Sequence, residues 1–405
     1  EDIEYDDDDE TTEYQRIIDQ ISEEMVSHYS EEEEQVIAIF SHMLRGSNGS
    51  PQRIKQSISE EEAHVLSEHL DRLPHIDLQR DSSREYVYGD TLKSLFGSVG
   101  SIPSDGIDQY LTQGYQRSDL VGVSYLEAQY EEALRGQKAE ISRTQTKKGS
   151  GPAESFVEEK QGSRGNDLVL SIDMEYQQLA DEIVQNEVMA NQGRFIRDAS
   201  AYAIVMNPKT GDVLAMSGYH DPAGGDGSFN PLGTVNNAYE FGSVVKGASV
   251  LAGMEEGVVG PGTVITDRPL EFADTPIKRS VTSHGPIDMG TALERSSNVY
   301  MFDIAMRMGD YTYNPSLSRS ERRLFGTSTA NNVLDRSRYY FNQFGLGGST
   351  GVDLPSESLG MVGDLQEPGA SLDFMIGQFD TYSTLQLSQY ISTIANDGVR
   401  MRRAL

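Results

Sequence analysis

Two β-rich runs joined by a short connection give the strongest constraint on how this 405-residue chain folds. Residues 201–206 and 212–217 are rich in apolar and β-favouring side chains, and Asn207-Pro208-Lys209-Thr210-Gly211 separates them. Proline and glycine in a connection of this length favour a hairpin turn. The pattern therefore predicts an antiparallel pair of strands, with Lys209-Thr210-Gly211 as part of its turn.

Helical patterns flank the predicted hairpin on both sides. A short apolar run at 168–172 is interpreted as a strand. After it, apolar residues recur at i, i+3, i+4 and i+7, which predicts a helix with one buried face. That face carries Tyr176, Leu179, Ala180 and Ile183. Two further helices are expected, one with Val299, Phe302 and Met306, the other with Leu387, Tyr390, Ile391 and Ile394. Strands and helices occur in separate blocks, so the fold class is predicted to be α+β.

The chain is long enough for more than one domain. Residues 1–137 read as an irregular, mainly helical region, for example at 33–43. Residues 138–165 contain few apolar side chains and several glycines, which is typical of a linker. We therefore predict an N-terminal domain over 1–137, a linker over 138–165 and an α+β domain over 166–405.

The charge of the chain excludes several classes of function. Its formal net charge is −31, which argues against nucleic acid as a partner, because a polyanion repels a polyanion. Residues 1–34 hold 16 acidic side chains against the single Arg16, and we interpret this run as a solvated face or tail. The absence of cysteine excludes disulfides, thiolate zinc sites and cysteine nucleophiles.

A serine and a lysine at the start of a helical pattern form the first candidate site. Gly242-Ser243-Val244-Val245-Lys246 leads into an apolar pattern through residue 252. Residues three apart share one helix face, so the Lys246 amine can reach the Ser243 hydroxyl and take its proton. Backbone N–H groups at a helix N-terminus also stabilise negative charge on a bound carbonyl oxygen. Ser243 is a candidate nucleophile and Lys246 its candidate base.

A second polar element, Ser296-Ser297-Asn298, lies between two helical stretches at 288–295 and 299–308. In a loop there, a hydroxyl can relay a proton and an amide can hold a peptide bond. The alternative is that these residues cap the following helix, as serine and asparagine often do. The residues alone leave both interpretations open.

The order and setting of these elements resemble class B penicillin-binding proteins, the serine DD-transpeptidases of peptidoglycan synthesis. Within this family, the motif sequences are most similar to those of the elongation-specific 2b type of Gram-positive cocci. In the second half the resemblance is carried by Asn207 to Ser217, Leu232 to Asn236, Glu240 to Lys246, Ala292 to Asn298, Phe344 to Gly347, Thr350 to Pro355 and Ile376 to Asp380. In the first half, Arg84 to Gly89, Ser124 to Glu127 and Gln129 to Gly136 are similar to the non-catalytic pedestal of that family.

The resemblance implies roles for individual residues. Ser243 would form an acyl-enzyme with a stem peptide or a β-lactam, and Lys246 would act as its base. Ser296 would relay the proton to the leaving amine, and Asn298 would hold the backbone of the stem peptide. Ser297 and Gln378 are expected on the substrate side. No cofactor and no metal are expected.

The resemblance also implies partners and a location. The expected partners are peptidoglycan stem peptides, β-lactams, a separate membrane glycan polymerase and other proteins of the elongation complex. The expected location is the cell membrane, with a single N-terminal anchor before residue 1 and an extracellular catalytic domain. No run of about 18 apolar residues occurs within the chain itself.

The chain departs from the family pattern in two informative places. Phe241 stands where proline usually precedes Gly-Ser. The third family motif, K-T-G, lies late in the chain, whereas Lys209-Thr210-Gly211 precedes Ser243 and no lysine follows Lys278. We therefore expect that the C-terminal part of the transpeptidase domain is missing, and that these 405 residues alone react weakly with penicillin.

Two other functions share part of this pattern. A penicillin-recognising hydrolase, either a carboxypeptidase or a β-lactamase, has the same opening motifs. A non-catalytic scaffold of the cell-wall elongation machinery is the binding-protein alternative. The pedestal-like first half favours a transpeptidase, and the stability of a penicillin adduct distinguishes the three.

Overall fold

The computed structural model describes residues 29–44, 54–55, 58–73, 76, 78, 84–117, 119–137, 140–146, 154–160, 162–196, 198–222, 226–402 and 405. Most of the acidic run, residues 1–28, lies outside this part of the chain. The chain divides into two compact units, one made of residues 1–85 and 101–120, the other of residues 86–100 and 121–405.

Helices account for the regular structure described within the first unit. They are α3 (Glu31–Leu44), α4 (Glu60–His69), the 3₁₀ turn η1 (Leu70–Arg72) and α6 (Ile107–Thr112). The helix predicted at 33–43 is confirmed as α3, whose first turn carries four glutamates that the helix dipole favours. A capping box begins α4, in which Ser59 and Glu62 each accept the other's backbone N–H.

The second unit begins with short elements. These are α5 (Lys93–Phe96), α7 (Tyr125–Gln129) and α8 (Glu131–Leu134), and the strands β1 (Val99–Ser101) and β2 (Leu120–Gly122) flank residues 102–119. Within the predicted linker, β3 (Glu140–Thr146) and β4 (Glu154–Lys160) form an antiparallel ribbon. The linker therefore contains regular structure that its composition did not indicate.

Early residues of the second unit share a hydrophobic cluster with later ones. Leu92, Leu95 and Leu126 are buried in the same cluster as Val213 and Met216. The side chains in this cluster come from both sides of the predicted linker. The proposed boundary at 138–165 stays a prediction.

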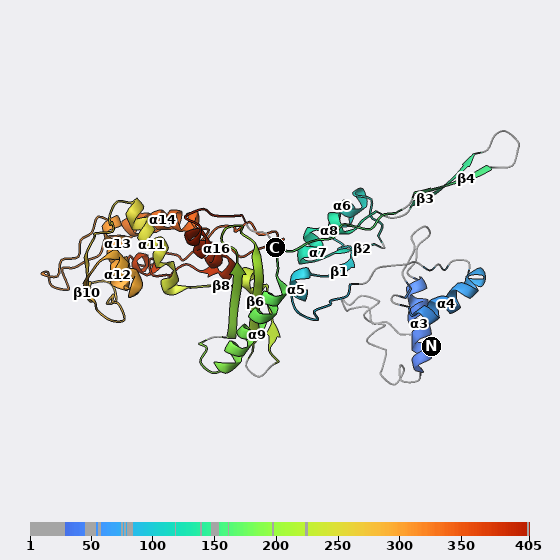
Figure 1. The fold of residues 1–405 in the computed structure, drawn as a ribbon, viewed down its shortest axis with the longest axis horizontal. Helices are drawn as coiled ribbons and strands as arrows, with labels where there is room; N and C mark the ends of the chain where they lie inside the picture. The colour runs from blue at the N-terminus through green and yellow to red at the C-terminus, as the bar shows by residue number, and fades with distance from the viewer. Residues whose placement is uncertain are drawn as a thin grey trace, which may run out of the picture. The chain divides into compact units, whose positions relative to one another are not determined.

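A three-stranded antiparallel sheet of order β5-β6-β7 confirms the predicted hairpin. Its strands are β5 (Ala199–Met206), β6 (Val213–Asp221) and β7 (Ser228–Phe229) (Figure 1). The turn at 207–211 is closed by the Gly211 N–H, which donates to the Asn207 carbonyl oxygen at 2.9 Å. Gly211 has a φ of +87°, a conformation that glycine adopts without strain. Lys209-Thr210-Gly211 is therefore a turn, as predicted.

Helix α9 (Met174–Ala190) lies against this sheet, but the predicted buried face is wrong (Figure 1). Tyr176, Leu179 and Ile183 are each about half exposed. The buried face instead carries Gln177, Asp181, Val184 and Val188. The Gln177 amide accepts from the Met216 N–H at 2.8 Å and donates to the Met216 carbonyl oxygen at 2.8 Å. Pairing with the free backbone groups of β6 makes burial of this polar side chain favourable.

The predicted strand at 168–172 is also wrong, because these residues form no ladder with a neighbour in the described chain. The segment is attached to β6 by other contacts. The Ser171 hydroxyl donates to the Val213 carbonyl oxygen at 2.8 Å, and the Asp173 N–H donates to the Leu214 carbonyl oxygen at 2.8 Å.

The remaining described elements belong to the second unit, and one of them is a largely buried helix. They are α10 (Gly233–Asn236), β8 (Ala238–Tyr239), η2 (Gly242–Val245), α11 (Lys246–Glu255), β9 (Ile265–Asp267), β10 (Gly285–Ile287), α12 (Met289–Glu294), α13 (Asn298–Met308), α14 (Thr327–Gln343), α15 (Ala370–Phe374), β11 (Tyr382–Ser383) and α16 (Thr384–Ala395). Both helices predicted in this half are confirmed as α13 and α16. Helix α13 has eight buried side chains and packs against α11, β9 and α15. The separate helical and strand blocks confirm the α+β class.

Candidate active site

Ser243 lies in the 3₁₀ turn η2, directly before helix α11, and its side chain is exposed. The turn starts at Gly242, which has a φ of +59°. The Gly242 N–H donates to the Gly377 carbonyl oxygen at 3.0 Å. A Cβ added at Gly377 would lie 2.3 Å from the Gly242 carbonyl oxygen, so the two backbones are in direct contact. This contact fixes the entry to the Ser243 turn.

Gln378, the expected substrate-side residue, follows this contact directly. Its side chain is exposed, and its N–H donates to the Asp373 carbonyl oxygen at 3.1 Å. The Gly377 contact therefore places the backbone of Gln378 close to the Ser243 turn.

Lys246 is the first residue of α11 and is 2% exposed. Its Nζ donates to the Asn298 Oδ1 at 2.6 Å, to the Ser296 carbonyl oxygen at 2.7 Å and to the Ser296 Oγ at 3.0 Å. Ser243 is not among its hydrogen-bond partners in the described chain. The structure thus joins the first and second motifs through the amine.

Burial changes the proton affinity of this amine. Desolvation lowers the pKa of Lys246 to about 8, against an opposing effect from the negative charge of Asp267. With this value, about one amine in ten is neutral at pH 7, compared with about one in 3,000 for an unperturbed lysine. A base of this kind has a useful population of its reactive form near neutral pH.

The second motif forms the connection between α12 and α13. Ser296 has a φ of +54°, in the left-handed region that non-glycine residues seldom adopt, and its side chain is exposed. Asn298 is the first residue of α13 and is half-buried. Ser296 and Asn298 therefore both direct oxygens toward Lys246, as a shared site requires.

Ser297 has a different environment from its neighbours. Its side chain is fully buried, accepts the Tyr300 N–H at 3.1 Å and donates to the Asp267 Oδ2 at 2.6 Å. This geometry corresponds to the helix-capping alternative and leaves the hydroxyl facing the protein interior rather than a ligand.

Two residues of this region were missed by the sequence analysis. Asp267 on β9 and Ser280 are both buried and are hydrogen-bonded behind the second motif. They belong to no motif. The available signal was the alternation of β9, in which Ile265 and Asp267 share one face, so that a carboxylate falls on the buried side of a strand.

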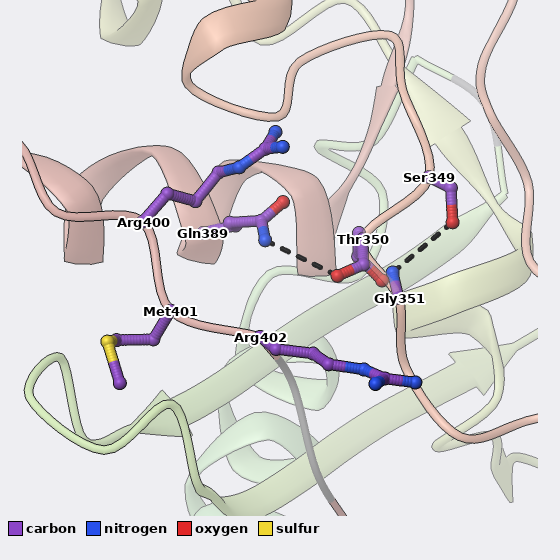
Figure 2. Close-up of a pocket in the computed structure, with 7 residues that line it drawn as sticks. All are labelled: Ser349, Thr350, Gly351, Gln389, Arg400, Met401 and Arg402. Atoms are coloured by element: carbon purple, nitrogen blue, oxygen red, sulfur yellow. Dashed lines mark hydrogen bonds between the residues drawn. The ribbon is translucent and has the colours of Figure 1, made fainter.

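The pocket in Figure 2 lies elsewhere and contains none of the predicted site residues. It is lined by Ser349, Thr350, Gly351, Gln389, Arg400, Met401 and Arg402. The Gln389 amide donates to the Thr350 carbonyl oxygen there at 3.4 Å (Figure 2). A Cβ on Gly211 would lie 2.4 Å from the Arg402 carbonyl oxygen, so the Lys209-Thr210-Gly211 turn contacts this segment and not Ser243.

The described residues contain neither a metal-binding cluster nor a membrane-spanning helix. No cluster of three or more histidine, aspartate or glutamate side chains there has the arrangement of a metal site. Among the same residues, no helix has the length and apolar character needed to span a bilayer.

Comparison with known proteins identifies the family. Residues 201–405 match the penicillin binding protein transpeptidase domain, and residues 2–170 match the penicillin-binding protein dimerisation domain. Penicillin-binding protein 2A of Bacillus subtilis (strain 168) is 40% identical over 403 residues, which cover 97% of this chain and 55% of that protein. The chain spans about half the length of the curated relatives it matches.

Solved structures agree with this assignment. Penicillin-binding protein 2B of Streptococcus pneumoniae (strain 5204) has a TM-score of 0.79 at 32% identity, and the match covers 98% of this chain and 66% of that one. PBP2 in a complex with MreC from Helicobacter pylori shares the fold, with a TM-score of 0.64 at 19% identity over 93% of this chain and 72% of that one. With a dimerisation domain followed by a transpeptidase domain, the chain belongs to the class B penicillin-binding proteins.

Proposed function

We propose that this chain is the acyl-transferring part of a serine DD-transpeptidase that cross-links peptidoglycan stem peptides and is a target of β-lactams. The observation that carries the proposal is the buried Lys246 amine, which contacts Ser296 and Asn298 and lies one helical turn from the exposed Ser243. Family membership supports the same chemistry.

The first half-reaction forms an acyl-enzyme. As an ammonium ion, Lys246 donates all three of its protons to Ser296 and Asn298. After it loses one proton, its lone pair accepts the proton of the Ser243 hydroxyl. The Ser243 Oγ then forms a bond to the carbonyl carbon of the penultimate D-alanine, and the bond from that carbon to the terminal D-alanine nitrogen breaks. The Ser296 hydroxyl passes the proton from Lys246 to the leaving amine.

The second half-reaction transfers the acyl group. An amine of a neighbouring stem peptide attacks the ester carbonyl carbon, forms the cross-link and releases the Ser243 oxygen. The proton from the attacking amine returns to Ser243 through the same groups. Asn298 holds the backbone of the donor stem peptide, and the exposed side chain of Gln378 contacts the substrate. A β-lactam takes the place of the donor peptide and leaves a stable ester.

The family also suggests partners and a location. PBP2 of Helicobacter pylori has been solved in a complex with MreC, and from it we infer that the dimerisation-domain part of this chain binds a protein of the elongation complex. We propose that the catalytic part works outside the cell membrane, held by an N-terminal anchor, beside a separate glycan polymerase. Glycan polymerisation by the purified protein would contradict this division of labour.

Labelling with a fluorescent penicillin tests the proposal. The assay is run on these 405 residues and, in parallel, on the product of the complete gene, because the chain spans about half of its curated relatives. A stable adduct on the complete product supports a transpeptidase. Rapid turnover would indicate a hydrolase, and no adduct on the complete product would indicate a non-catalytic scaffold.

A further inference from the structure

Behind the second motif lies a buried polar network that the proposed mechanism does not use. Asp267, Ser280 and Ser297 are 1%, 5% and 0% exposed. The Asp267 Oδ2 accepts from the Ser280 hydroxyl at 2.7 Å and from the Ser297 hydroxyl at 2.6 Å. Its second oxygen, Oδ1, is buried without a hydrogen-bond partner in the described chain. A buried carboxylate with this arrangement is costly, so its role needs an explanation.

The two hydroxyls satisfy the N-terminus of α13. The Ser280 Oγ accepts from the Asn298 N–H at 2.9 Å and from the Val299 N–H at 3.2 Å. The Ser297 Oγ accepts from the Tyr300 N–H at 3.1 Å. The first three amides of the helix are thereby paired, which a helix start requires.

The carboxylate determines which way both hydroxyls point. A hydroxyl has one proton, and here Ser280 and Ser297 both give theirs to Asp267. Their lone pairs are therefore left facing the helix amides. A negative charge in this position also interacts favourably with the N-terminal end of the helix dipole.

The same helix start carries the oxygens that receive the Lys246 amine. Asn298 is its first residue, and Ser296 precedes the cap with a left-handed backbone. Any movement of this turn moves the Asn298 Oδ1 and both Ser296 oxygens relative to the Lys246 Nζ.

We propose that Asp267 is a positioning residue, whose carboxylate orients Ser280 and Ser297 to hold the first turn of α13 and, with it, the oxygens that bind Lys246. The inference rests on the proposed function, because it assigns Asp267 to the base of that reaction. Asp267 contacts no reacting atom. It acts through the capped turn and through its charge.

The charge effect has a definite direction. The carboxylate of Asp267 is the group in the described chain whose charge acts on Lys246, and it raises the pKa of the amine against the effect of burial. Two other titratable groups lie on elements packed nearby. The Tyr390 hydroxyl on α16 accepts from the Ala248 N–H of α11, the helix that carries Lys246, and Lys278 is paired with Asp373. Removal of the Asp267 charge should therefore lower the pKa of Lys246 below its value of about 8.

The first experiment measures the pKa of Lys246 directly. The whole chain is labelled with ¹³C at lysine Cε and titrated by NMR, and the Lys246 signal is assigned with the Lys246→Arg variant. In Asp267→Asn the pKa should fall by about one unit. A pKa within about 0.2 units of the unmodified chain would overturn the proposal.

The second experiment measures the capped turn and remains informative if Asp267→Asn does not fold. Ser280→Ala removes one hydroxyl and leaves the carboxylate in place. Hydrogen exchange at the Asn298 and Val299 amides should become at least about tenfold faster, because both lose their acceptor. Unchanged exchange at these two amides would also overturn the proposal.

A matched control is available on the same helix. Asp303 is a partly buried carboxylate on α13 that pairs with Arg307 and not with the network. Asp303→Asn should leave both the Lys246 pKa and the Asn298 exchange rate unchanged, and a shift of either by as much as in the test variants would overturn the assignment. Neither the Lys246 pKa nor the amide exchange rates depend on penicillin. If both change as proposed but the protein forms no penicillin adduct, only the proposed function is overturned.

Discussion

The Lys246 Nζ lies 2.6 Å from the Asn298 Oδ1, which joins two motifs that are 52 positions apart in the sequence. The candidate base is therefore positioned by hydrogen bonds to the second motif, and not by one to the nucleophile Ser243 three residues away. The reactivity of Ser243 is therefore expected to depend on Ser296 and Asn298, which form no hydrogen bond with its side chain in the described chain.

Ser243→Ala should abolish penicillin labelling and leave the fold intact. The Ser243 side chain is exposed and has no hydrogen-bond partner in the described chain, so its loss should change the free energy of unfolding by less than about 1 kcal/mol. Mass spectrometry of the labelled complete product should find the adduct on Ser243. An adduct on Ser296 would refute the assignment of the nucleophile.

Lys246→Ala should slow acylation by about a hundredfold or more, because the base is lost. Lys209→Ala is the matched control, since Lys209 belongs to the only K-T-G triplet of the sequence but lies in the β5–β6 turn. The control should acylate at the rate of the unmodified protein. Equal losses in the two variants, measured by stopped-flow labelling, would contradict the different roles assigned to the two lysines.

Acylation should accelerate as the pH rises. Burial lowers the pKa of Lys246 to about 8, and the neutral amine is the reactive form. Below this pKa the neutral fraction rises about tenfold per pH unit, and above it the fraction reaches its limit. The acylation rate measured from pH 6 to pH 9.5 should follow this curve, whereas a rate that falls over the same range would exclude a neutral lysine base.

Gly377→Ala should disturb the Ser243 turn. Gly377 has a φ of +74°, and its Cβ would lie 2.3 Å from the Gly242 carbonyl oxygen, so the backbone must move. We expect a loss of about 2 kcal/mol or more in the free energy of unfolding, together with slower acylation. Gly193→Ala is the control, because Gly193 has a similar φ of +79° but open space around it. Urea unfolding of both variants separates the steric contact from backbone strain alone.

Asp380→Ala should destabilise the second unit strongly. Asp380 is 5% exposed and forms two hydrogen bonds of 2.8 Å with the guanidinium of Arg338. Removal of one partner leaves a half-buried charge unpaired, which costs about 3 kcal/mol or more. Asp167→Ala removes an exposed ion pair with Arg164 and should cost less than about 1 kcal/mol. Similar costs for the two variants in urea unfolding would refute this ranking.

Local patterns predicted the elements that depend on local interactions. The hairpin at 199–221 followed from its turn residues, and α13 followed from its apolar periodicity. Ser243, Lys246, Ser296 and Asn298 were selected by motif and order along the chain, and the structure brings Lys246, Ser296 and Asn298 into hydrogen-bond contact.

Features that depend on tertiary pairing were not predictable in the same way. Periodicity selected the apolar face of α9 as buried, but Gln177 occupies the sheet side because Met216 offers it both a donor and an acceptor. Ser297 resembles its neighbour Ser296 in the sequence, yet only Ser297 faces the carboxylate of Asp267. These outcomes depend on partners 30 or more positions away.

The three acceptors of Lys246 introduce redundancy into the site. One of them is the Ser296 carbonyl oxygen, which belongs to the main chain and persists whatever side chain occupies that position. Replacement of Ser296 or Asn298 singly should therefore leave the amine one side-chain acceptor and the main-chain carbonyl oxygen. Loss of both side chains leaves only the carbonyl oxygen, so the double change should displace the Lys246 amine by more than the sum of the two single changes. The position of the Lys246 amine would then tolerate either single substitution but not the pair, and this tolerance is separate from the proton relay assigned to Ser296 and the substrate contact assigned to Asn298.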